Sequence, residues 1–445
     1  MMEPSLTTLI GDEIEGDNKW STFVDGKNGF FYGIPYNARR VVKFNPLDKS
    51  LTEIGPDLGE FGSKWKCGVL ANSSSIYCAP YGAEHVLKIN INDGTVETLD
   101  DVELPERGHA GLWASGALAP DNLIYYMPSN ARRIMRLNPD NDSLSSVGDD
   151  LGGGEYSGTV VGNGDYVYGI PDDATCIVKF DPSNPATTST VGENAEEAFE
   201  RVFLCGNGVL CGDGYIYAAD RSGQVLKIDT TISAYTWIGD PIYPRGLWGW
   251  GDPIIGVDKC IYWPPIHANH VLKFDPWTRE LPSLVGDDLR EEGFGYKWLG
   301  GALATNGVIY CIPFCSEHIL AIDPFKEISM TMKNNIIKYP EELGRLFLAK
   351  DGYKETFYNS AVRKFGIKKV FKFLVEECLP SDKEWADTHS GNLPLFMVAA
   401  SCENSVVSVI YLFLRRNVHD AFLSGNDAGV SKKRKCDVLD CGVSN

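Results

Sequence analysis

Aromatic residues recur at the ends of long glycine-rich segments in this 445-residue chain, and three of them directly follow a lysine. Such segments include GPDLGEFGSKW, DDVELPERGHAGLW and GDDLREEGFGYKW. Aromatic rings beside ammonium groups at a cavity mouth can bind a peptide, a glycan or a planar ligand. Rings at one position of a repeat can instead pack as core between neighbouring units. The candidate binding residues in these segments are Lys19, Trp20, Lys64, Trp65, Trp113, Tyr156, Trp250, Lys297 and Trp298.

A second recurring position carries mostly basic or imidazole side chains. Three histidines at equivalent positions suggest a metal site, but equivalent positions of a closed repeat array are spread around a ring. Convergence of their imidazoles within about 2 Å of one ion is therefore not expected. We predict no metal and no cofactor, and regard solvent-facing or strand-capping side chains as the simpler interpretation. The candidates for partner binding here are Arg40, His85, Arg133, His270 and His318, in a series completed by Cys176 and Gln224.

Acidic residues at the ends of other β-type runs suggest oxygen ligands for calcium, although Gly followed by Asp is ordinary turn chemistry. They are Asp12, Glu13, Asp57, Asp149, Asp150, Asp240, Asp287 and Asp288. The nucleophile elbow, the phosphate-binding loop, the dinucleotide fingerprint and the HExxH helix are all absent from the sequence. We therefore name no catalytic residue and favour a binding protein over an enzyme.

One phrase occurs seven times along the chain, as FFYGIP, SIYCAP, LIYYMP, YVYGIP, YIYAAD, CIYWPP and VIYCIP. Its period of about 46 residues falls in the range of propeller repeats. Further β-type runs such as KWKCGVL, RVVKFNP and SLTEIG lie before and after the phrase. Four short strands separated by turns form one antiparallel blade. The shared tyrosines are Tyr32, Tyr77, Tyr125, Tyr168, Tyr217, Tyr262 and Tyr310.

Blades must stack around an axis, because a single sheet of this kind cannot bury both faces. The segment SLTTLIG at residues 5–11 resembles an outermost strand but precedes the first complete repeat. We expect it to complete the last blade and close the ring. The predicted fold class is mainly β: a seven-bladed β-propeller of four-stranded antiparallel blades, closed by the N-terminal strand and followed by a small all-α C-terminal region.

These repeats resemble the seven-bladed β-propeller proteins, and more narrowly the tandem-repeat propeller proteins of unicellular algae, over residues 5–325. The WD ending of WD40 repeats is absent, and the Kelch double glycine occurs only in part, as Gly300 and Gly301. The resemblance implies a fold and leaves the activity open, since propellers include both enzymes and scaffolds.

We predict three regions: the propeller at 1–325, a helical region at 326–425 and a disordered basic tail at 426–445. The segment NLPLFMVAASCENSVVSVIYLFLRRN resembles one diverged ankyrin unit. Two amphipathic helices that cover another surface are the alternative, because a single ankyrin unit depends on stacked neighbours. A cluster in the tail resembles a nuclear-import signal, with a solvated tail as the alternative. It consists of Lys432, Lys433, Arg434 and Lys435.

The chain has 41 basic and 60 acidic residues, for a formal net charge of -19. This balance opposes non-specific binding to nucleic acid or to an anionic membrane. The N-terminus lacks the features of a secretory signal, so we expect a cytoplasmic monomer, with the nucleus as a further location. The predicted function is a non-catalytic scaffold that binds a protein or peptide through the loop face of the propeller. The alternatives are a metal-dependent propeller lyase or lactonase, and the binding of a glycan or another small ligand.

Overall fold

The computed structural model describes residues 5–326 apart from 107–110, 153, 193–206, 245–246, 279 and 293–294. Beyond Lys326 it describes residues 329, 350–351, 354–355, 357–366, 369–370 and 373. The chain divides into two compact units, Met1–Glu327 and Ile328–Asn445. Within the described residues, no helix is long and apolar enough to span a bilayer.

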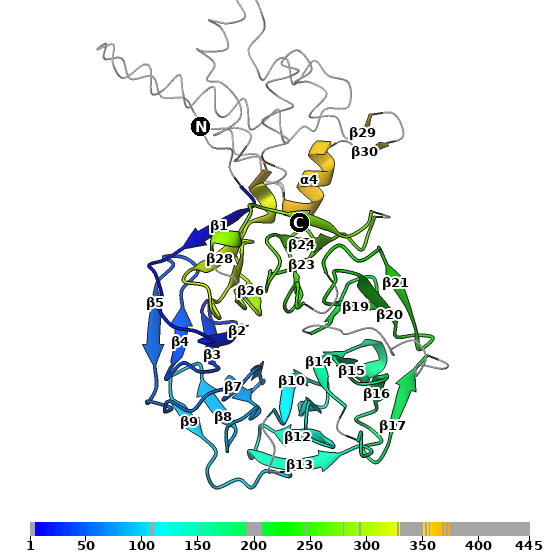
Figure 1. Ribbon diagram of the computed structural model, residues 1–445. Coiled ribbons are helices and arrows are strands. Elements are labelled where there is room, and N and C mark those ends of the chain that lie inside the picture. Colours follow the sequence, from blue (N-terminus) through cyan, green and yellow to red (C-terminus); the bar gives the residue numbers. More distant parts are fainter. Residues whose placement is uncertain are drawn as a thin grey trace, which may run out of the picture. The chain divides into compact units, whose positions relative to one another are not determined.

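Seven four-stranded antiparallel sheets stand around a central axis in the first unit, as Figure 1 shows. Blade one consists of β2 (Trp20–Asp25), β3 (Phe31–Pro35), β4 (Val41–Phe44) and β5 (Leu51–Ile54). Blade two consists of β6 (Val69–Leu70), β7 (Ser75–Cys78), β8 (Leu87–Asn90) and β9 (Val96–Thr98). Blade three consists of β10 (Trp113–Leu118), β11 (Ile124–Pro128), β12 (Ile134–Asn138) and β13 (Ser143–Val147). The predicted seven-bladed propeller is confirmed.

The remaining blades keep the same strand order. Blade four consists of β14 (Tyr156–Val161), β15 (Val167–Pro171), β16 (Ile177–Phe180) and β17 (Thr188–Val191). Blade five consists of β18 (Val209–Leu210), β19 (Tyr215–Ala219), β20 (Val225–Asp229) and β21 (Ala234–Ile238). Blade six consists of β22 (Ile254–Ile255), β23 (Ile261–Trp263), β24 (Val271–Phe274) and β25 (Ser283–Val285). Blade seven consists of β26 (Gly301–Leu303), β27 (Ile309–Cys311), β28 (Ile319–Ile322) and β1 (Thr7–Ile10).

The tyrosine of the repeated phrase is buried in every blade and explains why the phrase recurs. In several blades its hydroxyl reaches a turn of the next blade. Tyr77 donates to Asp142 at 2.7 Å, and Tyr310 of blade seven donates to the carbonyl of Pro46 in blade one at 3.4 Å. A buried phenol needs such a partner for its hydroxyl. The repeated tyrosine therefore packs within its own blade and joins neighbouring blades.

The N-terminal strand closes the ring as predicted. Strand β1 pairs antiparallel with β28, with Thr7 opposite Ile322 and Ile10 opposite Ile319 (Figure 1). Leu6 and Ile10 are buried in two different core clusters beside this strand. The last blade thus takes three strands from the end of the propeller sequence and one from its start.

The described part of the second unit contains the hairpin β29 (Lys350–Asp351) with β30 (Lys354–Glu355), and the helix α4 (Phe357–Phe365). The ankyrin-like segment and the basic cluster at 432–435 lie outside the described residues.

Candidate functional site

The glycine-rich segments between blades open on the same face as the loops that follow the second strands. The strand register places them there, because Trp20 pairs with Pro35 and Trp113 pairs with Pro128. Trp20, Trp113 and Tyr156 begin first strands, and Trp65 and Trp250 form isolated bridges shortly before theirs. All five lie opposite the proline that ends the repeated phrase. Residues that follow the phrase therefore surround the entrance of the central channel.

The aromatic residues predicted as a partly exposed ring are buried, so that prediction is wrong. Their relative exposures lie between 0% for Trp113 and Trp298 and 6% for Trp20. These aromatic side chains pack instead as part of the core, which is the alternative given in the sequence analysis. Five indole N–H groups each donate to a backbone carbonyl 20 residues further along the chain. In blade four the hydroxyl of Tyr156 instead lies 3.8 Å from the side-chain sulfur of Cys176. The donors Trp20, Trp65, Trp113, Trp250 and Trp298 reach the carbonyls of Arg40, His85, Arg133, His270 and His318 at 2.8–3.2 Å.

The lysines that precede three of these aromatic residues are also buried. The Lys64 ammonium donates to the carbonyls of Asn37 and Phe61, at 3.1 and 2.8 Å. The Lys19 ammonium donates to the carbonyl of Ser316 at 3.0 Å. Burial lowers the pKa of Lys297 to about 8. Lys19 and Lys64 hold the backbone of the segments between blades, and the ring predicted to offer ammonium groups to a ligand is not formed.

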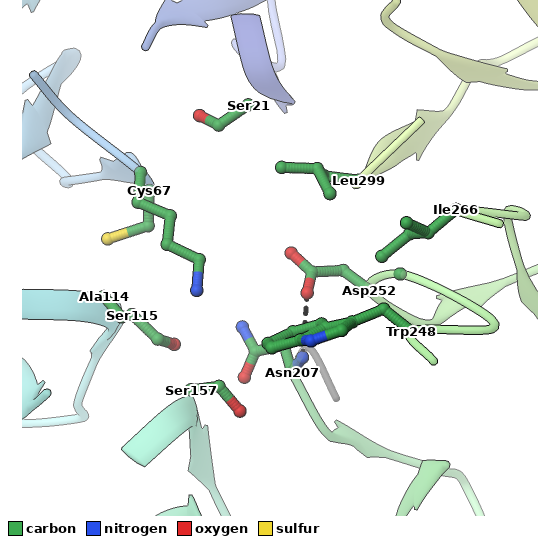
Figure 2. A pocket seen from close by; sticks show the side chains of 12 residues that line it. Ser21, Cys67, Ala114, Ser115, Ser157, Asn207, Trp248, Asp252, Ile266 and Leu299 are labelled. Atoms are coloured by element: carbon green, nitrogen blue, oxygen red, sulfur yellow. Dashed lines mark hydrogen bonds between the residues drawn. The ribbon is translucent and has the colours of Figure 1, made fainter. Parts of the chain in front are cut away.

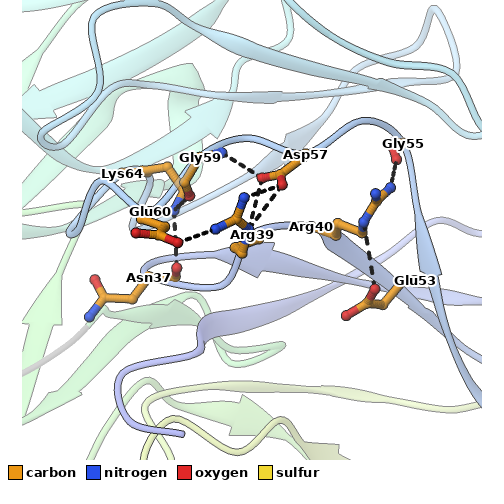
Figure 3. Close-up of polar contacts among 9 residues, drawn as sticks. All are labelled: Asn37, Arg39, Arg40, Glu53, Gly55, Asp57, Gly59, Glu60 and Lys64. Carbon is orange, nitrogen blue, oxygen red and sulfur yellow. Dashed lines mark hydrogen bonds and ion pairs between the residues drawn. The ribbon is translucent and has the colours of Figure 1, made fainter.

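The second series of predicted residues caps strands. Arg40 and Arg133 donate to the carbonyls of Gly55 and Gly148, at the ends of the outer strands of their own blades; Figure 3 shows Arg40 in this position. His270 contacts the equivalent carbonyl of Gly286 at 3.2 Å. His318 lies 3.3 Å from the carboxylate of Glu292. The strand-capping interpretation describes Arg40, Arg133 and His270. The backbone carbonyls of these residues and of His318 accept the indole hydrogen bonds described above.

Several carboxylates considered as calcium ligands are paired with arginines. Figure 3 shows Asp57 bound by the guanidinium of Arg39, and Asp150 is held by Arg132 in the same way at 2.7 Å. A side-chain hydrogen bond from Arg39 lowers the pKa of Asp57. Over the described part of the chain, no group of three or more His, Cys, Asp or Glu side chains is placed to hold a metal ion.

A different set of side chains meets at the entrance of the channel. The ring centroid of Phe314 lies 5.1 Å from that of Tyr36, which lies 6.0 Å from that of Tyr81. In the other direction, the centroid of Tyr296 lies 6.2 Å from that of Phe314 and 6.3 Å from that of Trp248. Five aromatic residues from different blades and connecting segments thus form one continuous arc.

An ion pair extends this arc. The guanidinium of Arg221 lies 3.9 Å from the centre of the Trp248 ring and 2.7 Å from the carboxylate of Asp172. Their side chains are 17% and 7% exposed, so most of this ion pair is removed from water. We use the name mouth ring for Tyr36, Tyr81, Asp172, Arg221, Trp248, Tyr296 and Phe314.

Beside the mouth ring, where the first strands begin, the channel contains a hollow of about 40 Å³. Figure 2 shows side chains of several blades around it, including Ser115, Ser157, Asn207 and Asp252, with the ring of Trp248 as one wall. Lys66 also lines the hollow. The backbone N–H of Asn207 donates to Asp252 at 2.8 Å, and its side-chain oxygen accepts from the N–H of Thr159 at 2.8 Å.

The carboxyl groups of this region have altered pKa values. Burial raises the pKa of Asp252, and the charge of Lys66 opposes that change. Burial likewise raises the pKa of Asp172 against the effect of Arg221 and Lys66. The pKa of Glu155 is raised by burial and by the neighbouring Asp173 and Asp172. Perturbed groups of this kind often accompany binding and catalytic sites.

The sequence analysis did not identify the mouth ring or the hollow. One signal was available: the residue directly after each phrase changes type from blade to blade, whereas the phrase itself is kept. These seven residues are Tyr36, Tyr81, Ser129, Asp172, Arg221, Ile266 and Phe314. The hollow has a signal of the same kind, because the residue directly after each repeated aromatic lines it. These six residues are Ser21, Lys66, Ala114, Ser157, Gly251 and Leu299.

No model of a protein family matches the chain, and no curated protein matches it. Solved propellers share its fold. Virginiamycin B lyase from Staphylococcus aureus is 14% identical, with 71% of this chain and 98% of that chain covered and a TM-score of 0.58. Hydrazine synthase from Kuenenia stuttgartiensis is 11% identical, with 69% and 96% covered and a TM-score of 0.52. At such identities the likeness shows the fold alone.

Proposed function

We propose that the chain is a non-catalytic scaffold whose mouth ring binds a peptide or a segment of a protein. The observation that carries this proposal is the variation of the residue after each phrase. Packing keeps tyrosine and tryptophan at equivalent places of the blades, yet the next position carries aromatic, acidic, basic, aliphatic and hydroxyl side chains. Several of these side chains are buried, yet the blades accept different chemistry at this position, so it can serve recognition.

The chemistry of the mouth ring suits a peptide. Aromatic residues and arginine contribute most of the binding energy in many protein interfaces, especially where they surround a recess. Tyr296 is 37% exposed and lies within the arc, between Phe314 and Trp248. The Arg221–Asp172 pair adds charge at the Trp248 end. A partner could therefore bury apolar side chains on the arc and place a polar group at the channel.

Quantitative affinity purification from extracts of the producing cells tests this proposal. We expect the Tyr296→Ala variant to lose partners that the wild-type protein retains, because it removes an accessible ring without opening a blade core. Trp277→Ala is the matched control, since Trp277 is 59% exposed and lies in a turn between the outer two strands of blade six. An unchanged partner list for folded Tyr296→Ala protein would refute the assignment of the face.

Two further measurements separate the proposal from its alternatives. Metal analysis of the purified protein addresses a lyase or lactonase, and stoichiometric metal that is required for turnover would replace the scaffold by an enzyme. Tryptophan fluorescence across a glycan panel addresses glycan binding through Trp248. A glycan that binds with the affinity expected of a specific ligand would replace the peptide as the proposed partner.

We also propose that the second unit provides another contact, that the protein is a cytoplasmic monomer, and that residues 432–435 direct part of it to the nucleus. Imaging of a tagged chain with and without residues 426–445 tests the location. An unchanged distribution after the deletion would contradict a role for the basic cluster.

A further inference from the structure

We infer that the hollow beside the mouth ring binds the ammonium group of a lysine from the partner. This inference rests on the proposed function and specifies the partner as a lysine-containing segment.

Negative charge exceeds positive charge around the hollow. Asp252 and Lys66 line it, and the charge of Lys66 also reaches Asp172 and Glu155, which Asp173 influences in turn. Lys66 and Arg221 are the positive groups that act on these carboxylates: Lys66 on Asp252, Asp172 and Glu155, and Arg221 on the last two. Two positive groups against four carboxylates leave a deficit that one further cation would reduce.

The titration behaviour agrees with this deficit. The pKa values of Asp252, Asp172 and Glu155 are raised even though Lys66 acts on all three groups in the opposite direction. In each case burial is the largest cause. A cation placed within about 4–6 Å of such a carboxyl group would favour its ionised form and oppose the effect of burial.

A hydroxyl group without a partner supplies an independent observation. The side-chain oxygen of Ser115 is buried, has no hydrogen-bond partner, and belongs to a residue that is 2% exposed. Ser115 lines the hollow, and Figure 2 shows it on the side of the channel that faces Asp252 and Asn207. A buried polar atom of this kind normally has a partner. A bound ammonium group would supply one.

The size and the acceptors of the hollow fit an ammonium group. An ammonium is about as large as a water molecule, whose share of liquid volume is about 30 Å³, and the hollow measures about 40 Å³. An ammonium group has three donors and no acceptor. The carboxylate of Asp252 and the hydroxyls of Ser115 and Ser157 offer oxygen atoms around the same space.

The charge of the whole propeller favours the same partner. Residues 1–325 contain 23 Lys plus Arg and 45 Asp plus Glu. A field of this sign accelerates the approach of a basic segment and opposes that of an acidic one. The general field brings a basic segment near, and the hollow would then select one lysine from it.

Fluorescence anisotropy with labelled hexalysine tests the inference, with hexa(Nε-acetyl-lysine) and hexaglutamate as comparison probes. We expect Asp252→Asn to weaken hexalysine binding about tenfold, equivalent to about 1.4 kcal/mol. Asparagine can still accept the N–H of Asn207, which keeps the local backbone in place. Lys66→Gln should instead strengthen binding by about threefold to tenfold, since it removes the repulsion between two ammonium groups.

Glu97→Gln is the matched control, because Glu97 is an exposed carboxylate on the outer strand β9. It should change hexalysine affinity by less than about twofold, as expected for a screened surface charge. The inference is overturned if Asp252→Asn acts no more strongly than Glu97→Gln, if Lys66→Gln weakens binding, or if an acetylated or acidic probe binds better. Should Tyr296→Ala still lose its partners in that case, the proposed function stands and only the lysine assignment fails.

Discussion

The repeated tryptophans link three places within each blade. In blade three, the fully buried Trp113 donates to the carbonyl of Arg133 at 3.2 Å, and the Arg133 side chain in turn donates to the carbonyl of Gly148. Trp113 thus connects the first strand of the blade to the loop before the third strand. Arg133, in that loop, connects it to the end of the fourth strand. This explains why a large indole recurs at the start of the blades.

We expect Trp113→Ala to lower the free energy of unfolding by about 3–5 kcal/mol, as for other large core truncations. Trp113→Phe keeps an aromatic ring but leaves the Arg133 carbonyl without its donor, and it should cost about 1–3 kcal/mol. Urea unfolding measures both. A folded Trp113→Ala protein of wild-type stability that has lost its partners would instead make this residue a recognition residue.

The burial of Lys297 predicts how the stability of the protein changes at alkaline pH. Lys297 is 1% exposed, and burial lowers its pKa to about 8 from a model-compound value of 10.5. Between these two values the unfolded chain holds more protons than the folded chain, so this residue's contribution to stability increases with pH. Lys297→Met removes the group. We therefore expect the stability of the wild-type protein, relative to that of Lys297→Met, to rise from pH 8 to pH 10.5 in thermal unfolding.

A constant or falling difference between the two proteins over that range would contradict the burial of a charged Lys297. The comparison with Lys297→Met is needed because several buried tyrosines, among them Tyr77, also have raised pKa values.

The connecting segments bring blades into close contact at the channel. Gly251 lies just before β22, where an added Cβ atom would overlap the carbonyl oxygen of Leu299 in the next blade. That carbonyl also accepts the N–H of Asp252 at 2.6 Å. The approach of two backbones therefore requires glycine at this position, and it also places Asp252 in the hollow.

Gly251→Ala should destabilise the propeller by about 1–3 kcal/mol, the usual cost of forcing atoms into a packed region. Gly212→Ala is its control, because the nearest atom to an added Cβ there is in the Trp277 ring, at an ordinary distance of 3.7 Å. Differential scanning calorimetry on both variants measures the difference. Equal melting temperatures would show that blades six and seven can separate at the channel without cost.

The elements of this fold could be predicted from the sequence to a greater extent than its site. The phrase around Tyr32 recurs because each blade uses that tyrosine for the same packing, so periodicity reveals it. Lys66 and Asp252 follow the repeated tryptophans by one and two residues, but their residue types do not repeat, and only closure of the ring brings them to the same hollow. The exposed aromatic ring was predicted wrongly because a periodic tryptophan is typical of both core and binding surface.

At the scale of the whole molecule, stability depends on the joint between the two ends of the propeller. Beyond its pairing with β28, strand β1 is held by polar contacts from two directions. The hydroxyl of Thr7 accepts the N–H of Asp287 at 2.8 Å, and the ammonium of Lys326 donates to the hydroxyl of Thr8 at 2.8 Å. Blades six and seven both contact this segment, so its loss affects more than one sheet.

Deletion of residues 1–11 removes this joint and leaves β28 as an open edge. Burial of Leu6 and Ile10 alone is worth about 1.5–3 kcal/mol for each side chain, so we expect a clear fall in the thermal midpoint together with aggregation through the exposed edge. Addition of a synthetic peptide of residues 1–14 should raise the midpoint again as its concentration increases, because it binds only the folded ring. Thr8→Ala in the full chain removes only the exposed contact with Lys326 and should lower the midpoint far less than the deletion does. A deletion variant that melts like the wild-type protein, or one that the peptide cannot stabilise, would show that the ring remains closed without β1.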